Sequence, residues 1–181
     1  AGTSIFLGMK WATGLLDPSS LGLTNQLISQ GEKDSAFSSR PRSYDDPETL
    51  KTIVLMTDGK NDRSHRIASW AYQTPSHYAH WDRYNFNYYL NRYVSHYNRG
   101  GWYNQKYDAA KGDLLTDRIC DAAKDNGIVI WSIGFEVDDH GASVMRDCAS
   151  SPSHFFRVEG VEIKDAFEAI GRQINNLRLT Q

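Results

Sequence analysis

Two apolar segments decide the fold of this chain: TIVLMTDG at residues 52–59 and IVIWSIGFEV at residues 128–137. In the first segment every residue from Ile53 to Thr57 is apolar or β-branched, and polar residues do not alternate with apolar ones. Such runs are typical of strands that are covered on both faces in a parallel sheet. A shorter run, HFFRV, predicts a third strand. We therefore expect three parallel strands, adjacent in the order 52–58, 128–136 and 154–158.

Segments with helical periodicity lie before, between and after these strands. Apolar residues recur at helical spacing from Ile5 to Leu16, and similar stripes precede the second strand and follow the third. Asp113 is predicted to cap the helix before the second strand, and Gly127 to end it in the left-handed conformation. Alternating strands and helices predict a three-layer, doubly wound, Rossmann-like α/β domain. We expect its helices near 4–17, 113–126 and 162–178, with a short one at ASVMRDCA (142–149).

Three strands are few for such a sheet, and the first of them would keep one unpaired edge. Exposed strand edges promote association, so natural proteins cover or protect them. We therefore expect N-terminal strands to be missing from this chain and the edge of strand 52–58 to be covered by another element. The candidates are the insertion described next, a second copy of the chain in a homodimer, or a complementing N-terminal fragment.

Residues 60–112 differ in composition from the rest of the chain. They hold nine of the ten tyrosines, three of the five tryptophans and four of the six histidines. This bias predicts an insertion into the core fold, and the spacing of apolar residues from Phe86 to Tyr97 predicts a helix in part of it. Residues 18–50, rich in Ser, Gly, Asp, Pro and Arg, predict a loop with at most a short helix around 25–30.

The bulk composition bears on the class of function. A formal net charge of -2 and a pI of about 6.3, without a basic tract, give no electrostatic reason to expect nucleic-acid binding. No run of eighteen apolar residues occurs, so no membrane span is expected in this stretch, and no signal peptide is visible. Cys120 and Cys148 are compatible with two buried thiols or with one disulfide that would contribute about 3 kcal/mol.

Five segments of the chain match a known pattern: GTSIFLGMKWATGLLDP, VLMTDG, CDAAKDNGIVIWSIGFEV, CASSPSHFFRVEG and AFEAIGRQINNLRLTQ. The first three resemble the helix entry, the central strand, and the following helix and strand of von Willebrand factor A (vWA) domains. The last two resemble the C-terminus of TadG-like (TadE/TadG-type) envelope proteins of the tight-adherence (Flp) pilus assembly. The resemblance covers most of residues 1–17, 50–62 and 113–181, but not the aromatic insertion.

The resemblance implies a metal-ion-dependent adhesion site at one edge of the sheet. In the family a divalent cation is held by a DxSxS motif, by a threonine from a second loop and by an aspartate after the fourth strand. Thr3 matches this threonine and Asp58 this aspartate, and hard oxygen ligands suit Mg²⁺. The sequence has no DxSxS, because the chain begins after the place where that motif should be. Two ligands hold Mg²⁺ poorly in water, so we expect the cation only in the complete domain.

The resemblance also implies a cellular location. TadG-like proteins are anchored in the inner membrane, with the vWA part on the periplasmic or extracellular side. In that oxidising environment, we expect Cys120 and Cys148 to form a disulfide. Membrane anchoring would then depend on upstream sequence.

Two functions of different class follow. The first is a non-catalytic adhesion or assembly module whose aromatic insertion contacts a protein or a surface glycan. The second is a metal-dependent hydrolase that uses His77, His80 and Asp82 of the insertion. Acid–base catalysis by Asp58 with His65 is a weaker possibility, because the pattern places no nucleophile or oxyanion hole near them. A plainer alternative is that the insertion caps the core, with its tyrosines buried against the sheet. The expected contact residues are Trp70, Trp81, Tyr88, Tyr89, Tyr93 and Trp102.

Overall fold

The computed structural model describes residues 3–179 and has a mixed α/β architecture. The body, which is the described chain outside residues 64–107, contains a three-stranded parallel sheet. The strands are adjacent in the order β1 (Thr52–Thr57), β4 (Val129–Phe135) and β5 (Phe155–Val158). The strand positions, order and direction predicted from the sequence are therefore confirmed.

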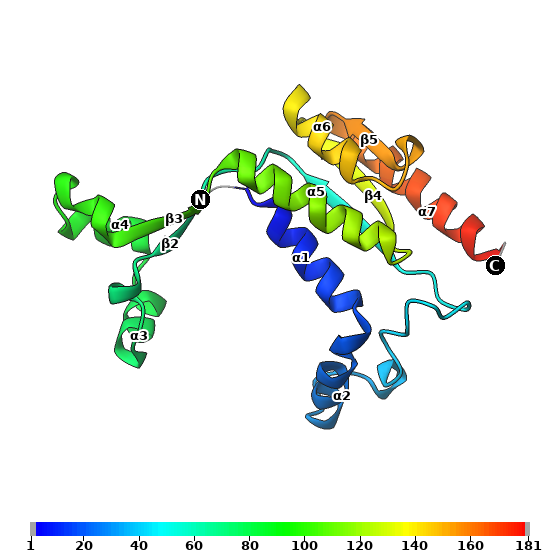
Figure 1. Cartoon of the computed structure of the whole chain (residues 1–181), viewed down its shortest axis with the longest axis horizontal. Helices are drawn as coiled ribbons and strands as arrows, with labels where there is room; N and C mark the ends of the chain where they lie inside the picture. The colour runs from blue at the N-terminus through cyan, green and yellow to red at the C-terminus, as the bar shows by residue number, and fades with distance from the viewer. Residues whose placement is uncertain (1–2, 180–181) are drawn as a thin grey trace.

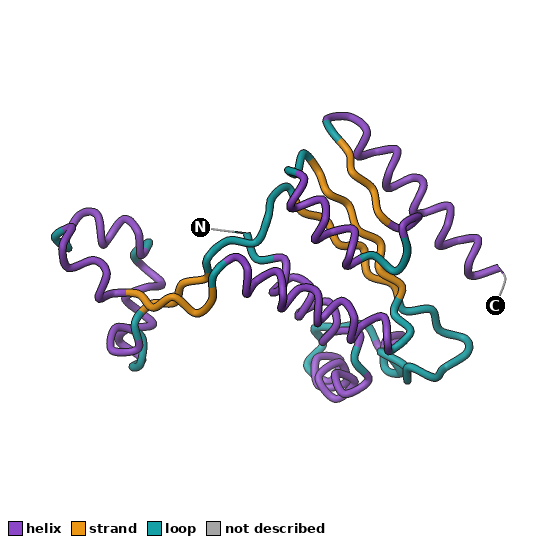
Figure 2. The backbone as a smooth tube through the Cα atoms, turned by 45° about the horizontal axis from the view of Figure 1, so that its top comes forward, coloured by secondary structure: helices purple, strands orange, loops and turns teal. Residues whose placement is uncertain are grey.

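Helices lie on both faces of this sheet (Figures 1 and 2). One face carries α1 (Ile5–Leu16), α5 (Ala109–Asp125) and α6 (Asp139–Cys148), and the other carries α7 (Ile163–Leu179). This doubly wound arrangement is compatible with a Rossmann-like fold. No helix among the described residues is long and apolar enough to cross a bilayer.

Each face of the sheet has its own apolar core. On the α1–α5–α6 face, Met9 of α1 packs with Ile53 of β1 and Ile130 of β4. On the α7 face, Trp131 of β4 packs with Ile170 of α7. Because β4 lies in the middle of the sheet, its inner residues are buried on both sides, as the continuous apolar run predicts.

Cys120 of α5 and Cys148 of α6 form a disulfide, with their Cα atoms 5.1 Å apart. Both side chains are buried in the first core, beside Ile130 and Met145. The bond joins two helices on the same face of the sheet across 28 residues of sequence. The expected Cys120–Cys148 pairing is confirmed.

The prediction that strand 52–58 is covered on both faces is wrong. Ile53 and Leu55 are buried against α1, but Val54 and Met56, on the α7 face, are 41% and 48% exposed. The reason is the position of α7, whose buried residues pack with β4 and β5 and not with β1. An apolar strip therefore remains uncovered on β1.

The outer edge of β1 is also unpaired within the described chain, because β1 pairs only with β4. The amide of Val129 donates to the carbonyl of Lys51, so alternate residues from Lys51 onward direct their backbone groups toward β4. The backbone N–H and C=O groups that point away from the sheet are therefore those of Thr52, Val54 and Met56.

Residues 64–107 form a separate arm that projects from the body (Figure 1). Its base is an antiparallel ribbon of β2 (Ser64–Ile67) and β3 (Tyr103–Tyr107). Between these strands lie α3 (Pro75–Arg83), α4 (Phe86–Tyr93) and a 3-10 turn (His96–Trp102). The insertion therefore does not cover the edge of β1, and its tyrosines are not buried against the sheet. Both of these expectations are wrong, because the ribbon directs the inserted chain outward.

Three local expectations are also corrected. Asp108, whose side chain accepts from the amide of Lys111, caps α5 in place of Asp113, which lies inside the helix. The helix of the insertion ends at Tyr93, before Tyr97. Residues 18–50 contain a full helix, α2 (Leu21–Ser29). Gly127, with a φ of 73°, does end α5 in the left-handed conformation, as expected.

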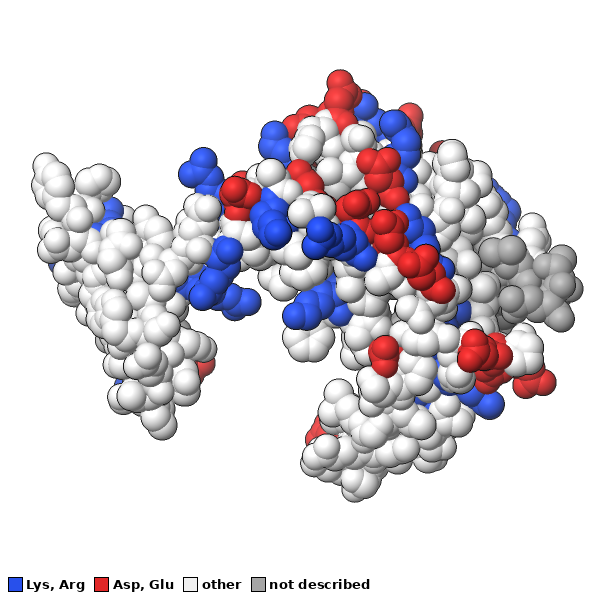
Figure 3. All heavy atoms as spheres, in the orientation of Figure 1, with Lys and Arg blue, Asp and Glu red and all other residues white. Residues whose placement is uncertain are grey.

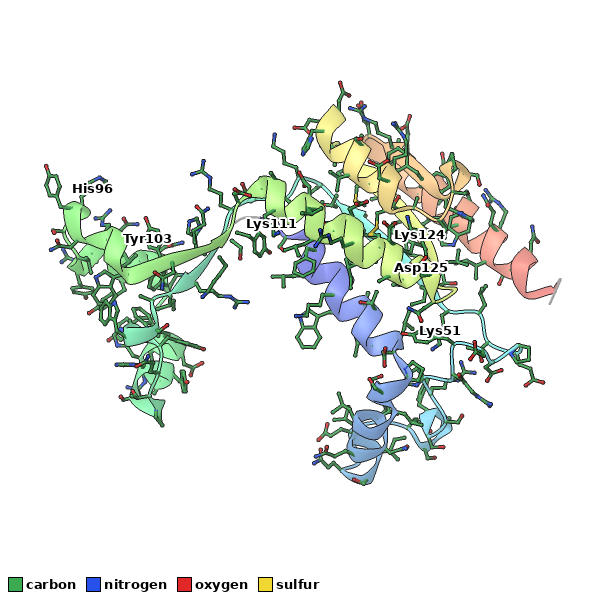
Figure 4. The ribbon with its side chains drawn as sticks, viewed as in Figure 1. Lys51, His96, Tyr103, Lys111, Lys124 and Asp125 are labelled. Atoms are coloured by element: carbon green, nitrogen blue, oxygen red, sulfur yellow. A yellow bond between two sulfur atoms is a disulfide. The ribbon has the colours of Figure 1, made fainter. Side chains whose placement is uncertain are left out.

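The loop after α2 is fastened to the body by a buried lysine at the start of β1 (Figure 4). Lys51 Nζ donates to the carbonyls of Leu16 and Arg42, and lies 3.9 Å from the centre of the Tyr44 ring. Burial lowers the pKa of Lys51, although the nearby carboxylates of Asp17 and Asp46 oppose this shift. The cation therefore joins the end of α1 to the loop.

Replacing both cysteines by alanine should lower the free energy of unfolding by about 3 kcal/mol, because the unfolded chain loses a constraint on a loop of 28 residues. Chemical denaturation with and without a reductant measures this effect. Reductant should destabilise the wild-type chain and leave Cys120→Ala/Cys148→Ala unchanged. Equal stability of the oxidised wild type and the variant would contradict the role assigned to the bond.

The unprotected edge of β1 should cause concentration-dependent association. Light scattering after size exclusion is expected to give a mass above 20.5 kDa at high concentration. Val54→Lys/Met56→Lys should reduce this association, since charged side chains on an edge strand oppose pairing. Trp11→Lys, at an exposed apolar residue of α1, is the control and should have a smaller effect. A monomeric wild-type chain at all concentrations would contradict the prediction.

Candidate functional site

The loop after β1 lies at the carboxyl edge of the parallel sheet, where open α/β sheets hold their ligands. The amide of Gly59 donates to the hydroxyl of Thr57 at 3.2 Å, which turns the chain sharply at the strand end. The side chain of Asp58 is exposed and has no hydrogen-bond or ion-pair partner among the described residues. Its carboxylate is therefore free to bind a cation or a donor from another molecule.

Thr3 lies beside this loop. Its carbonyl accepts from the amide of Asp62 at 2.9 Å, and its hydroxyl oxygen is 3.3 Å from the point that a Cβ on Gly59 would occupy. A side chain at residue 59 would therefore crowd Thr3. Ser4, and not Thr3, caps α1 by accepting from the amide of Leu7. The structure thus brings Thr3 next to the residue that follows Asp58.

Asn61 ties this edge to two helices. Its side-chain oxygen accepts from the amide of Ile5, and its side-chain nitrogen donates to Asp113 at 2.9 Å and to Thr116 at 3.0 Å. Asn61 is only 2% exposed, and a Cβ on Gly112 would be 3.0 Å from the Cβ of Asn61. Asn61 was not predicted from the sequence. The available signal was a polar residue two positions after the Asp-Gly that ends a buried strand.

Two polar contacts flank Asn61. Lys60 forms an ion pair with Asp138 at 2.8 Å, and His140 Nε2 lies within hydrogen-bond distance of Asp113, at 2.8 Å. The hydrogen bond from Lys60 and a second one from the amide of Gly141 lower the pKa of Asp138. The same bond with Asp138 raises the pKa of Lys60. Asp138 is thus already engaged and does not offer a free carboxylate beside Asp58.

The donor set suits a hard cation only in part. Asp58 offers a carboxylate and Thr3 a hydroxyl, the oxygen ligands that Mg²⁺ prefers. Within residues 3–179, no group of three or more His, Cys, Asp or Glu side chains is arranged to hold a metal ion. Thr3 and Asp58 therefore offer two oxygen donors at this edge, fewer than a Mg²⁺ ion takes.

The six aromatic residues predicted as a contact surface divide into two groups. Trp81, Tyr89 and Trp102 are half-buried and contact one another, with ring centroids 5.3 to 6.3 Å apart, so they form the small core of the arm. The other three rings lie at the surface of the arm. Trp70, Tyr88 and Tyr93 are 55%, 57% and 61% exposed.

The residues of the hydrolase alternative have local packing roles. His77 Nδ1 accepts from the amide of Gln73 at 3.2 Å. The ring of His80 lies 4.5 Å from that of Trp81 and 4.9 Å from that of Tyr89, inside the arm. His65 lies on β2, against Tyr103, and not in the loop of Asp58. The geometry therefore gives no specific support to the hydrolase.

The chain matches no known protein-family model, and comparison with curated proteins finds no significant relative.

Replacing Asn61 by alanine should destabilise the body by about 3 kcal/mol, because the amide of Ile5 and the side chain of Asp113 both lose a buried partner. Thermal and chemical unfolding measure the loss. Asn104→Ala, at an exposed position of β3, is the control and should change stability by less than about 0.5 kcal/mol. Similar small effects of both substitutions would contradict the central role of Asn61.

Proposed function

We propose that this chain is a non-catalytic adhesion or assembly module, and that its arm contacts another protein or a glycan of a cell surface. The observation that carries this proposal is the arm itself, which projects from the body and exposes Trp70, Tyr88 and Tyr93. Aromatic rings that stay exposed to water contribute little to the stability of the fold, but they provide a large contact area when a partner covers them.

The composition of the arm supports a binding role. Tyrosine and tryptophan offer rigid contact area at a low cost in conformational entropy, and asparagine, serine and glycine offer adaptable hydrogen bonds. The arm is rich in tyrosine, tryptophan, asparagine and serine. It also has five basic residues against one acidic residue, Asp82, and so carries +4. Because the whole chain carries -2, the remaining residues together carry -6. The arm is thus a basic, aromatic extension of an acidic body.

The carboxyl edge of the sheet supports the finer assignment to a vWA domain of the TadG-like class. Thr3 lies beside Gly59 and Asp58 has a free carboxylate, as an adhesion site of that family requires. A Mg²⁺ ion bound there would supply a positive charge able to accept a carboxylate from a partner. The missing ligands would come from upstream sequence or from a complementing fragment, which would also cover the open edge of β1.

The disulfide supports a location in the cell envelope. Disulfides persist in oxidising compartments such as the periplasm and the cell surface, and are rare in the cytosol. The Cys120–Cys148 bond is buried and joins two core helices, so it is part of the stable fold. We therefore propose that the module lies on the periplasmic or extracellular side. The resemblance to TadG-like proteins adds the proposal that it belongs to a pilus-assembly protein anchored in the inner membrane.

The exposed rings of the arm can be tested directly. Tyr88→Ala/Tyr93→Ala should weaken binding at least tenfold to envelope proteins, or to surface polysaccharides, isolated from the organism that encodes the chain. Biolayer interferometry with the immobilised chain measures this affinity. The fold should remain intact, because both rings are exposed, and circular dichroism checks it.

The control is Trp11→Ala, which removes an exposed aromatic side chain, 72% exposed, from α1 of the body. This substitution should change binding less than twofold. Equal losses for the two variants, or full binding by Tyr88→Ala/Tyr93→Ala, would show that the arm is not the contact surface.

A further inference from the structure

A groove of about 670 Å³ lies at the root of the arm, within the size range of ligand sites. The start of α1 forms one wall with Thr3 and Ser4. Another wall is formed by Arg63, just before β2, and by Arg66 of β2, and Tyr103 of β3 also lines the groove. The groove therefore lies between the carboxyl edge of the sheet and the arm, and Thr3 belongs to both.

The groove carries uncompensated positive charge. Arg63 and Arg66 are exposed, and neither has a carboxylate within ion-pair distance among the described residues. Figure 3 shows basic side chains gathered where the arm joins the body. One carboxylate, that of Asp62, also lines the groove, and its charge contributes to raising the pKa of Lys60. Two guanidinium groups against one carboxylate leave a site for an anion.

Aromatic and hydroxyl groups lie beside these cations. Tyr103 is 38% exposed, with the ring of His65 edge-on to it at 5.3 Å, and Phe86 of α4 is half-buried in the groove wall. Figure 4 shows Tyr103 on the arm side of the root and Lys111 on the body side. Thr3 and Ser64, which carry hydroxyl groups, also line the groove. Rings for stacking, hydroxyls and guanidinium groups together suit a sugar that carries a carboxylate.

We propose that this groove binds a carboxylate-bearing sugar unit of an acidic polysaccharide. Arg63 and Arg66 hold the carboxylate, Tyr103 packs against the sugar ring, and the exposed rings of the arm contact neighbouring units of the same chain. The proposal rests on the proposed function and gives a chemical class to the partner.

The charge distribution favours this partner over nucleic acid. Double-stranded DNA carries one charge per about 1.7 Å of helix axis, and affinity for it depends on neutralising many phosphates. The groove offers two free guanidinium groups, and the body beside it is acidic. A polymer with one carboxylate per sugar needs fewer cations per unit length than DNA does. Its sugar rings can also pack against the aromatic lining of the groove, which phosphate groups would not do.

Isothermal titration with oligogalacturonate at low salt tests the proposal. Arg63→Gln/Arg66→Gln should weaken binding at least tenfold, because it removes both charge-assisted contacts. Arg83→Gln/Arg92→Gln removes the same net charge from α3 and α4, outside the groove, and should change affinity less than twofold. Both pairs are exposed, so unfolding temperatures should remain close to that of the wild type.

Two further ligands separate the sources of affinity. The methyl ester of the same oligosaccharide keeps the rings and removes the charge, and should bind at least tenfold more weakly. Poly-L-glutamate keeps the charge and removes the sugar rings, and should also bind more weakly. Equal binding of the methyl ester would overturn the anion site. Equal binding of polyglutamate would overturn the sugar and indicate an acidic protein segment.

The same variants distinguish this inference from the proposed function. If Arg63→Gln/Arg66→Gln binds the isolated envelope partner fully while Tyr88→Ala/Tyr93→Ala does not, the groove assignment fails and the adhesion function stands. If the two arginine pairs lose affinity for oligogalacturonate equally, binding reflects diffuse charge, and the groove assignment also fails. If neither the groove pair nor the tyrosine pair affects partner binding, both proposals fail.

Discussion

The structure depends on one buried amide, that of Asn61. Its side chain accepts from the backbone of α1 and donates to two residues of α5, so three segments distant in sequence meet at the end of β1. A buried polar group of this kind destabilises the fold when it is unpaired, and favours one arrangement of its neighbours when all its hydrogen bonds are formed. Because all three bonds form only when α1, α5 and the β1 loop are in place together, Asn61 determines how the edge carrying Asp58 is assembled.

This constraint also determines where the arm begins. The chain leaves Asn61, passes Asp62, whose amide is held by the carbonyl of Thr3, and enters the β2–β3 ribbon. It returns at Tyr107, whose hydroxyl bonds to Ser4, also at the start of α1. Both strands of the ribbon are thus fastened to the same helix terminus. An arm rooted in this way can extend into solvent and still hold a defined position relative to the sheet edge.

The sequence predicted the body well because its signals are periodic and local. The runs around Ile53 and Ile130, and the helical stripes between them, follow from burial alone, and burial was correct for β4. The exposed face of Val54 and Met56 could not be predicted, because it depends on how far α7 extends across the sheet. Periodicity identifies a residue as apolar, but it does not show whether a partner element covers it.

The candidate site likewise contains residues that could be predicted from the sequence and residues that could not. Asp58 was predicted from its place after a buried strand, and Thr3 from the resemblance to vWA domains. Asn61, Arg63 and Arg66 were not predicted, since a short polar segment after a strand carries no periodic signal. For the arm, composition indicated that its aromatic residues are special but could not separate Trp81, Tyr89 and Trp102, which pack together, from the exposed rings. That separation requires the three-dimensional contacts of α3, α4 and the β3 end.

Thr3 connects the two parts of the proposed surface. Its carbonyl holds Asp62, its hydroxyl lies against Gly59, and its side chain lines the groove at the root of the arm. A ligand in the groove therefore contacts a residue that also lies at the edge beside Asp58. An acidic chain held by Arg63 and Arg66 would have its next carboxylates close to that edge. A cation bound at Asp58 would offset the negative charge of that carboxylate, so the groove and the cation-loaded sheet edge would favour one anionic partner.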